Sequence, residues 1–169
     1  TALRSQWGRH FLTFYAGSQS TFFDKNSSED ITNWDVGVSG RLDILGNGDV
    51  RANIYYDGLH EPRTSPNLVG AVAKPTAYGL FHGDAASDYK PNRLGVTMGV
   101  SYDSYRYENT PLTGGGVLPG AGRNENIYTA FGRTSYDFAP GYSAFVGGSY
   151  ENRNFLQFTD PAGFHRDSD

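Results

Sequence analysis

Hydrophobic and polar side chains alternate along residues 33–58 with a period of two. From Trp34 to Ile44 every second residue is apolar or glycine, and the residues between them are polar, charged or glycine. Successive side chains of a β-strand point to opposite faces, so this alternation predicts a strand. After a Gly-Asn-Gly turn at residues 46–48 the alternation resumes and runs from Val50 to Tyr56. Two such strands joined by a tight turn predict a β-hairpin.

The same alternation recurs along the chain and predicts about seven strands and no helix of useful length. The predicted strands are residues 8–18, 31–44, 50–59, 76–86, 93–107, 125–138 and 142–153. The connections alternate between tight turns, at residues 46–48, 89–92 and 139–141, and long polar segments, at residues 19–30, 60–75 and 109–124. An up-and-down array with all its long connections at one end is expected.

This layout is typical of outer-membrane barrels, which have short periplasmic turns and longer extracellular loops. Strands of soluble proteins usually contain about 5–6 residues, whereas a tilted strand that spans a bilayer needs roughly 9–11. Most of the predicted strands reach the larger figure. The sequence therefore predicts an all-β fold, an antiparallel up-and-down transmembrane β-barrel located in the bacterial outer membrane.

In such a barrel, the two sides of each strand contact different surroundings. The side chains expected to face lipid are Val36, Val38, Leu42, Ile44, Leu94, Val96, Met98 and Val100. The charged side chains expected to face the lumen are Asp35, Arg41, Asp43, Arg51, Asp57, Arg93, Asp103, Arg133 and Glu151. Two interpretations of this mixed charge stay open: it tunes what passes through a pore, or it forms cross-strand pairs that fill a narrow interior.

Composition supports more than one class of protein. A formal net charge of −4 and a mean hydropathy of −0.54 suit a soluble protein, for example a lipocalin-like β-barrel that binds a ligand. However, the 169 residues include 22 glycines, 15% aromatic residues and one methionine, which suits β-structure with a thin apolar surface better than a large core. The absence of cysteine excludes disulfides and thiolate metal sites. The scattered basic residues give no patch for nucleic acid.

Two loop segments resemble chemical motifs only in part. The segment His60-Glu61-Pro62-Arg63 contains one histidine and a proline, so it lacks the two histidines one helical turn apart of a zinc protease. His60, Glu61 and Arg63 are expected to order their loop instead. The glycine-rich run at residues 113–123 lacks the Lys-Ser/Thr pair of a phosphate loop and is expected to be a flexible extracellular loop. No metal site, cofactor or catalytic residue is predicted, and an enzyme is the least expected class.

The predicted strand number bears on domain organisation. Bacterial outer-membrane barrels have an even number of strands, whereas the pattern predicts about seven. Residues 1–169 are therefore expected to be a single barrel domain that is part of a longer polypeptide, with a barrel shared between two chains as the less favoured alternative. Two strand edges would otherwise lie unpaired in lipid.

Several stretches resemble the putative β-barrel porin type 2 family. They are GLHEPRTSPN (58–67), PTAYG, GVTMGVSYDSYRYEN, NENIYTAFGRTSYDFAPGYSAFVGGSYENRNF and the final FHRDSD. The resemblance covers most of the chain and implies an outer-membrane barrel of Gram-negative bacteria, often associated with exopolysaccharide export. It implies outer-membrane lipid and lipopolysaccharide, and also polysaccharide or export-complex proteins, as partners. A non-conducting anchoring barrel stays open as an alternative, and the resemblance supplies no catalytic residues.

Overall fold

Eight strands form one antiparallel sheet in the computed structural model, which describes residues 1–44, 46–62, 65 and 72–157. Each strand pairs with its neighbours along the chain, apart from one insertion between β6 and β9. The strands are β1 (Ala2–Trp7), β2 (His10–Thr21), β3 (Ile31–Ile44), β4 (Gly48–His60), β5 (Ala77–Tyr89), β6 (Leu94–Tyr107), β9 (Glu125–Ala139) and β10 (Tyr142–Phe155). The all-β, up-and-down prediction is confirmed.

The remaining elements are short and lie in the long connections. A 3-10 turn, η1 (Ser27–Glu29), lies between β2 and β3. The β6–β9 connection contains a two-stranded ribbon, β7 (Thr110–Pro111) with β8 (Val117–Leu118), and a second 3-10 turn, η2 (Ala121–Arg123). Within the described part of the chain, no helix is long and apolar enough to span a membrane.

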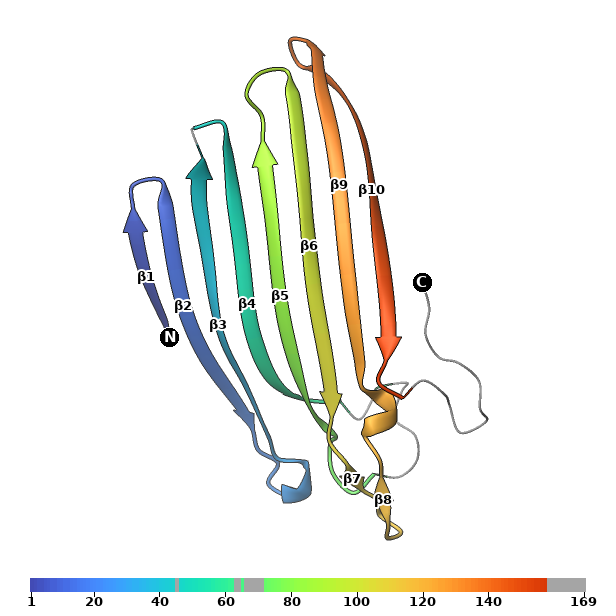
Figure 1. Ribbon diagram of the computed structural model, residues 1–169. Coiled ribbons are helices and arrows are strands. Elements are labelled where there is room, and N and C mark those ends of the chain that lie inside the picture. Colours follow the sequence, from blue (N-terminus) through green and yellow to red (C-terminus); the bar gives the residue numbers. More distant parts are fainter. Residues whose placement is uncertain (45, 63–64, 66–71, 158–169) are drawn as a thin grey trace.

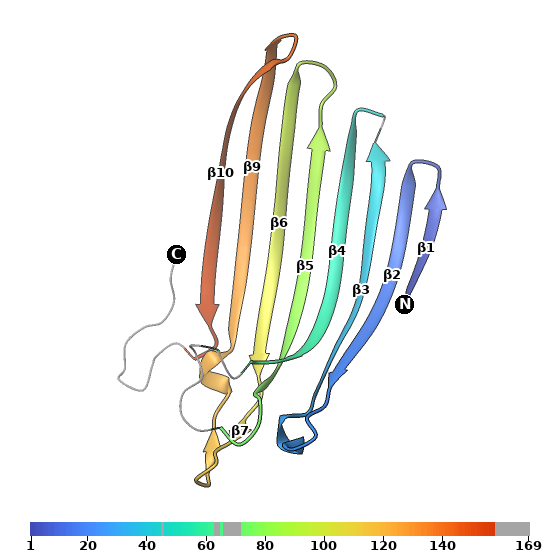
Figure 2. The ribbon, with the colours of Figure 1, turned by 180° about the vertical axis from the view of Figure 1, so that it is seen from behind.

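The tight turns and the long connections lie at opposite ends of the sheet. The turns β1–β2, β3–β4, β5–β6 and β9–β10 gather at the upper end in Figure 1, and the long connections gather at the lower end; Figure 2 shows the same division from behind. Gly8 and Gly141 have φ angles of 63° and 78°. This left-handed conformation is accessible to glycine at little cost, which explains why glycine occupies these hairpin turns. We call the two ends the turn end and the loop end.

The sheet is open within the described residues, because β1 and β10 each pair on one side only. It also lacks the core of a soluble domain. Val72, in the β4–β5 connection, is the buried hydrophobic residue of the described chain, whereas large apolar side chains along the strands are exposed. A packed protein interior therefore does not hold the described strands together.

Several predicted boundaries were wrong. The sheet has eight strands rather than seven, because residues 2–7 form β1 and pair with β2 through a turn at Gly8. β5 continues to Tyr89, three residues beyond the predicted end. Arg93 precedes β6 instead of lying within the strand. The glycine-rich segment contains β8 and η2, so its described residues are more ordered than a flexible loop.

Candidate functional site

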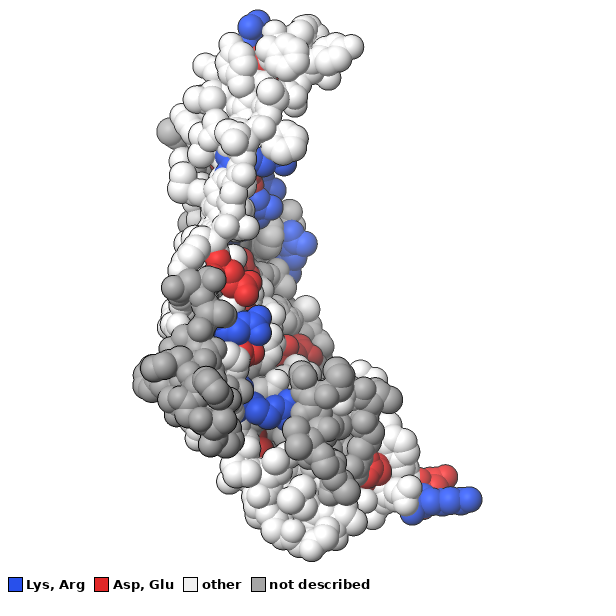
Figure 3. Space-filling model, turned by 90° about the vertical axis from the view of Figure 1, so that its right-hand side faces the viewer, with Lys and Arg blue, Asp and Glu red and all other residues white. Residues whose placement is uncertain are grey.

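The strand register sorts the side chains into two faces. Directly paired residues of neighbouring strands lie on the same face, and the pairs Asp35↔Asp57 and Arg41↔Arg51 therefore belong to one polar face. The pairs Val36↔Tyr56 and Val38↔Ile54 belong to the opposite, apolar face. Seen along the sheet from its β10 edge in Figure 3, charged side chains gather along one side of the curved sheet and uncharged ones along the other.

The apolar face is largely exposed. Leu42, Met98 and Val100 are 57–58% exposed, and they belong to a contiguous apolar surface of a kind that monomeric soluble proteins rarely expose. The register places on this face all eight residues predicted to contact lipid, which are Val36, Val38, Leu42, Ile44, Leu94, Val96, Met98 and Val100. A continuous apolar surface of this extent requires an apolar partner outside the chain.

Aromatic residues border the apolar face toward the loop end. Six consecutive strands of the sheet each contribute one aromatic residue: Trp34, Tyr56, Phe81, Tyr102, Tyr128 and Tyr150. Three neighbouring pairs of rings are in contact, with centroid separations of 5.4 Å for Trp34–Tyr56, 6.0 Å for Phe81–Tyr102 and 4.9 Å for Tyr102–Tyr128. The aromatic residues of neighbouring strands are not always direct register partners. Phe81, for example, pairs with Ser104, and the aromatic residue of β6 is Tyr102, two residues closer to the turn end. Such a shift is what a level ring requires on tilted strands.

A second aromatic row lies nearer the turn end. Tyr89, Tyr136 and Tyr142 lie eight positions along their strands from the first row. At about 3.3 Å per residue the two rows are roughly 26 Å apart along the strand, and a tilt of about 40° reduces the height to about 20 Å. Outer-membrane barrels have an apolar band about 25 Å tall between two aromatic girdles. The height between the two rows is therefore about four-fifths of the height of that band.

The polar face near the turn end is an ion-pair network. Arg41 contacts Asp43 at 3.0 Å and Asp49 at 3.2 Å, and Arg51 contacts Asp49 at 3.0 Å and also pairs with Asp88. These pairs link β3, β4 and β5, and they compensate for the like charges that the register places directly opposite each other. In this part of the polar face, the contacts match the interpretation in which the charged side chains pair across strands.

The polar face near the loop end carries an excess of carboxylates. Asp35 and Asp57 are register partners, and neither forms an ion pair with another described residue. His82 lies between Asp103, at 2.6 Å from Nδ1, and Asp84, at 2.9 Å from Nε2. Both ring nitrogens therefore face carboxylate oxygens. Even with this histidine charged, acidic groups outnumber basic ones at this end of the face.

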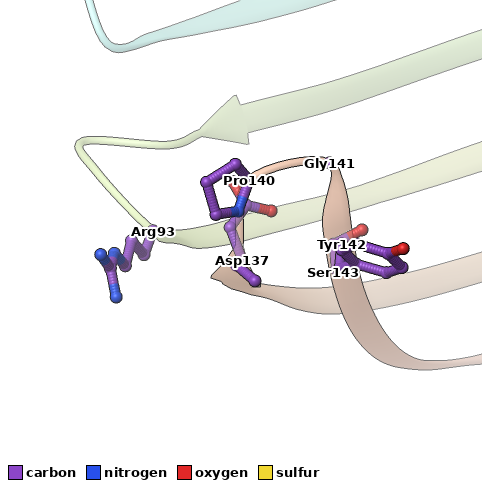
Figure 4. Close-up of a pocket in the computed structure, with 7 residues that line it drawn as sticks. Arg93, Asp137, Pro140, Gly141, Tyr142 and Ser143 are labelled. Carbon is purple, nitrogen blue, oxygen red and sulfur yellow. The ribbon is translucent and has the colours of Figure 1, made fainter.

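Most of the residues predicted to face the lumen lie together on the polar face, which contains Asp35, Arg41, Asp43, Arg51, Asp57, Asp103, Arg133 and Glu151. Arg93 is separate. It borders a depression of about 540 Å³ at the β9–β10 turn, where its carbonyl accepts a hydrogen bond from the Asp137 N–H at 2.9 Å. Figure 4 shows its side chain pointing away from Pro140 and Tyr142.

Sequence reasoning missed several members of this face. Asp84 follows His82 by two residues on the same strand, so the period-two pattern already placed them side by side. Asp88 fell outside the predicted strand, which was ended at residue 86. Asp49 lies just before the predicted strand 50–59, although it belongs to the paired part of β4 and lies opposite Asp43 and Asp88.

The long connections form the other compact region, which we call the loop cluster: Glu61, Ser65, Val72, Thr76, Thr110 and Arg123. The Arg123 guanidinium donates to both oxygens of the Glu61 carboxylate at 2.8 Å, and the Ser65 hydroxyl donates to one of them at 2.7 Å. The Arg123 guanidinium also lies over the Tyr107 ring, 4.0 Å from its centroid. The hydrogen bond from Arg123 lowers the pKa of Glu61 below its ordinary value.

The loop-ordering role predicted for residues 60–63 fits these contacts where they are described. Glu61 links the β4–β5 and β6–β9 connections, and His60 Nδ1 lies 3.0 Å from Asn33 Oδ1. Arg63 lies outside the described residues. In the ranges that the structure describes, no group of three or more His, Asp or Glu side chains has the geometry of a metal site.

Comparison with known proteins identifies the family. The family described as Putative beta-barrel porin 2 matches residues 1–169, the whole of the chain. No curated protein and no solved structure matches the chain. The family description agrees with the long antiparallel strands, the division into two faces and the aromatic rows, and it suggests an outer-membrane location. The chain therefore belongs to the Putative beta-barrel porin 2 family.

Proposed function

We propose that this chain forms wall segments of an outer-membrane β-barrel, with its apolar face on lipid and its polar face lining a conduit for hydrophilic solutes. The observation that carries the proposal is the exposed apolar face between two aromatic rows, with charged residues confined almost entirely to the other face. Every backbone group of a strand in lipid needs a partner, so the barrel closes by further pairing at β1 and β10.

The charges of the polar face favour cations at the loop end of the conduit. Asp35 and Asp57 lie side by side without a basic partner among the described residues, whereas the charges near the turn end are largely paired. Rings of carboxylates attract cations and repel anions in channels. A conduit with this wall passes small cations more readily than small anions.

Export of polysaccharide is a second candidate, favoured by aromatic side chains on the polar face. Tyr78 lies 5.1 Å from Tyr107 and 6.4 Å from Tyr105 between ring centroids, so three rings line the loop end of this face. A tyrosine side chain combines a flat apolar ring with a polar hydroxyl group. Such side chains suit a sugar ring, which presents both apolar and hydrated groups. Because the nearby carboxylates repel negative charge, a neutral polymer fits better than an acidic one. Export-complex proteins would then be partners at the membrane.

The experiment is the conductance of the full-length protein in planar bilayers, measured in a salt gradient. Channels with a reversal potential that favours cations support the conduit, and Asp35→Asn/Asp57→Asn should lower the cation-to-anion permeability ratio by about two- to threefold. Asp43→Asn is the matched control, because Asp43 lies on the same face of β3 but is ion-paired with Arg41. Current block by a neutral oligosaccharide would support the polymer path. A protein that inserts and never conducts would instead be an anchoring barrel.

A further inference from the structure

One residue breaks the pattern of the apolar face. Across the eight strands of the sheet, the register places a single Lys, Arg, Asp or Glu side chain on that face, and this residue is Arg106 on β6. Gly79, its partner on β5, belongs to the same face as Phe81 and Tyr56. A charge in contact with lipid tails is costly, so the position of Arg106 relative to the apolar band decides what it contacts.

Arg106 lies outside the apolar band, beyond the aromatic row at the loop end. It follows Tyr102 by four residues on β6, which places it roughly 13 Å further along the strand. The neighbouring positions of the same face beyond this row are polar, with Asn126 on β9 and Asn152 and Asn154 on β10. In a barrel whose long loops are extracellular, this level is the headgroup region of the outer leaflet.

The guanidinium is held in place by the sheet and keeps hydrogen-bonding capacity. Nη1 donates to the Tyr105 carbonyl at 2.8 Å and to the Glu125 carbonyl at 3.1 Å, and Nη2 donates to Asn126 Oδ1 at 2.7 Å. These bonds use three of the five N–H groups of an arginine. No carboxylate among the described residues forms an ion pair with it, so its charge is not neutralised within the described part of the chain.

We infer that Arg106 binds a phosphate group of a lipid headgroup in the outer leaflet, namely the lipid A phosphate of lipopolysaccharide. Arginine matches phosphate oxygens with paired N–H donors, and Asn126 holds the guanidinium at the level where such phosphates lie. Basic residues at the headgroup level are recognised lipid contacts. The inference rests on the proposed orientation in the outer membrane, with the apolar face on lipid and the long loops outside.

The test is titration of the full-length protein, folded in detergent micelles, with lipopolysaccharide, with bound lipid counted by native mass spectrometry. Arg106→Gln should weaken binding about five- to tenfold, whereas Arg106→Lys, which keeps the charge but not the paired donors, should weaken it about two- to threefold. Arg153→Gln is the matched control: it removes an arginine at the same end of the sheet but on the opposite face, and it should leave lipopolysaccharide binding unchanged.

A change of ligand makes the test independent of whether the variants fold. Lipid A stripped of its phosphates should bind the wild-type protein as weakly as lipopolysaccharide binds Arg106→Gln. Equal binding of the two lipids by the wild-type protein would overturn the inference, as would a wild-type affinity in Arg106→Gln. Full displacement of lipopolysaccharide by millimolar inorganic phosphate would assign the site to free phosphate instead. Conductance of Arg106→Gln should match that of the wild-type protein, so a failure of this inference is distinguishable from a failure of the conduit.

Discussion

The eight-stranded sheet and the loop cluster differ in what their side chains contact. Glu61, Val72, Thr76 and Thr110 of the loop cluster are buried, with exposed fractions of 1–6%, and they are joined by hydrogen bonds such as Thr110 to Thr76 at 2.9 Å. Within the eight described strands of the sheet, the buried residues are Gly95, Gly99 and Ser104 on β6, and the aliphatic side chains of the apolar face point outward.

The two regions are therefore built for different surroundings. The buried polar groups of the loop cluster are hydrogen-bonded to one another, as they are in the interior of a soluble protein. The sheet satisfies its backbone through strand pairing but leaves its apolar surface for an external partner, which is the requirement for spanning a bilayer with strands.

A charge at the middle of the apolar face should have the largest effect. Val38 lies four residues from Trp34 and four from Leu42, at the centre of the band on β3. Val38→Arg should lower the free energy of unfolding from lipid vesicles by about 2–4 kcal/mol, since an arginine side chain at the bilayer midplane loses its hydration. Denaturant titration of the full-length protein in vesicles measures this. Ser39→Arg, on the polar face of the same strand, is the control and should cost far less; equal losses in both variants would contradict the assignment of the faces.

Glu61→Gln should open the loop cluster and leave the sheet intact. The substitution leaves the half-buried Arg123 guanidinium without its carboxylate, at a cost of about 2–3 kcal/mol. Amide hydrogen exchange measures the opening, because the Glu61 N–H donates to the Thr76 carbonyl at 2.8 Å and the Ala73 N–H donates to the Pro111 carbonyl at 2.8 Å. Exchange in both amides should accelerate while the amides of β3 and β4 keep their rates. Uniform acceleration across the sheet would show that the two regions are one cooperative unit.

The same carboxylate gives the loop cluster a dependence on pH. The hydrogen bond from Arg123 holds the pKa of Glu61 below its ordinary value of 4.5. A lowered pKa in the folded protein means that the stabilisation is complete above the unfolded pKa and is lost as the pH falls through the folded value. Opening of the cluster, measured as exchange corrected for intrinsic rates, should be constant from neutral pH down to about 5 and rise below about 4.5. Glu61→Gln should lack this rise, and an identical rise in the variant would assign it to another group.

The smallest effect is expected at the border of the apolar face, where Trp34 covers Gly58. A Cβ atom at Gly58 would meet the indole ring, so Gly58→Ala should displace Trp34 at a cost of about 1 kcal/mol. In a Trp7→Phe background, which leaves Trp34 as the sole tryptophan, the emission maximum should shift. Gly132→Ala is the control, since a Cβ atom there has no neighbour within 4 Å among the described residues. An unchanged emission in Gly58→Ala would show that Trp34 is not packed on β4.

The strands and their faces were predictable because the two faces of each strand have different surroundings, so that apolar and polar residues alternate along the sequence. From Trp34 to Ile44 the period of two is uninterrupted, and the register agrees with it on every pair from Trp34↔Gly58 to Ile44↔Gly48. β1 was missed because its six residues are too few to establish a period, with Leu3 and Trp7 as its large apolar residues.

Contacts between distant segments were not predictable. Glu61 and Arg123 are 62 residues apart in two irregular connections, where no periodicity relates one position to another. His82 meets Asp103 only through the pairing of β5 with β6, which depends on the register of those two strands. Periodicity assigns a residue to a face, but the partners on that face come from strand pairing.

The accessibility of single cysteines on the two faces of β3 tests directly whether the apolar face contacts lipid. The chain has no cysteine of its own, so each introduced thiol is labelled without background. In the full-length protein in membranes, a lipid-phase probe should label cysteines at Val36, Val38 and Leu42, and a water-soluble reagent should label those at Asp35, Ser39 and Arg41. If the first set reacts with neither probe while the second reacts freely with water-soluble reagent, the apolar face is covered by protein, and the membrane-spanning account is wrong.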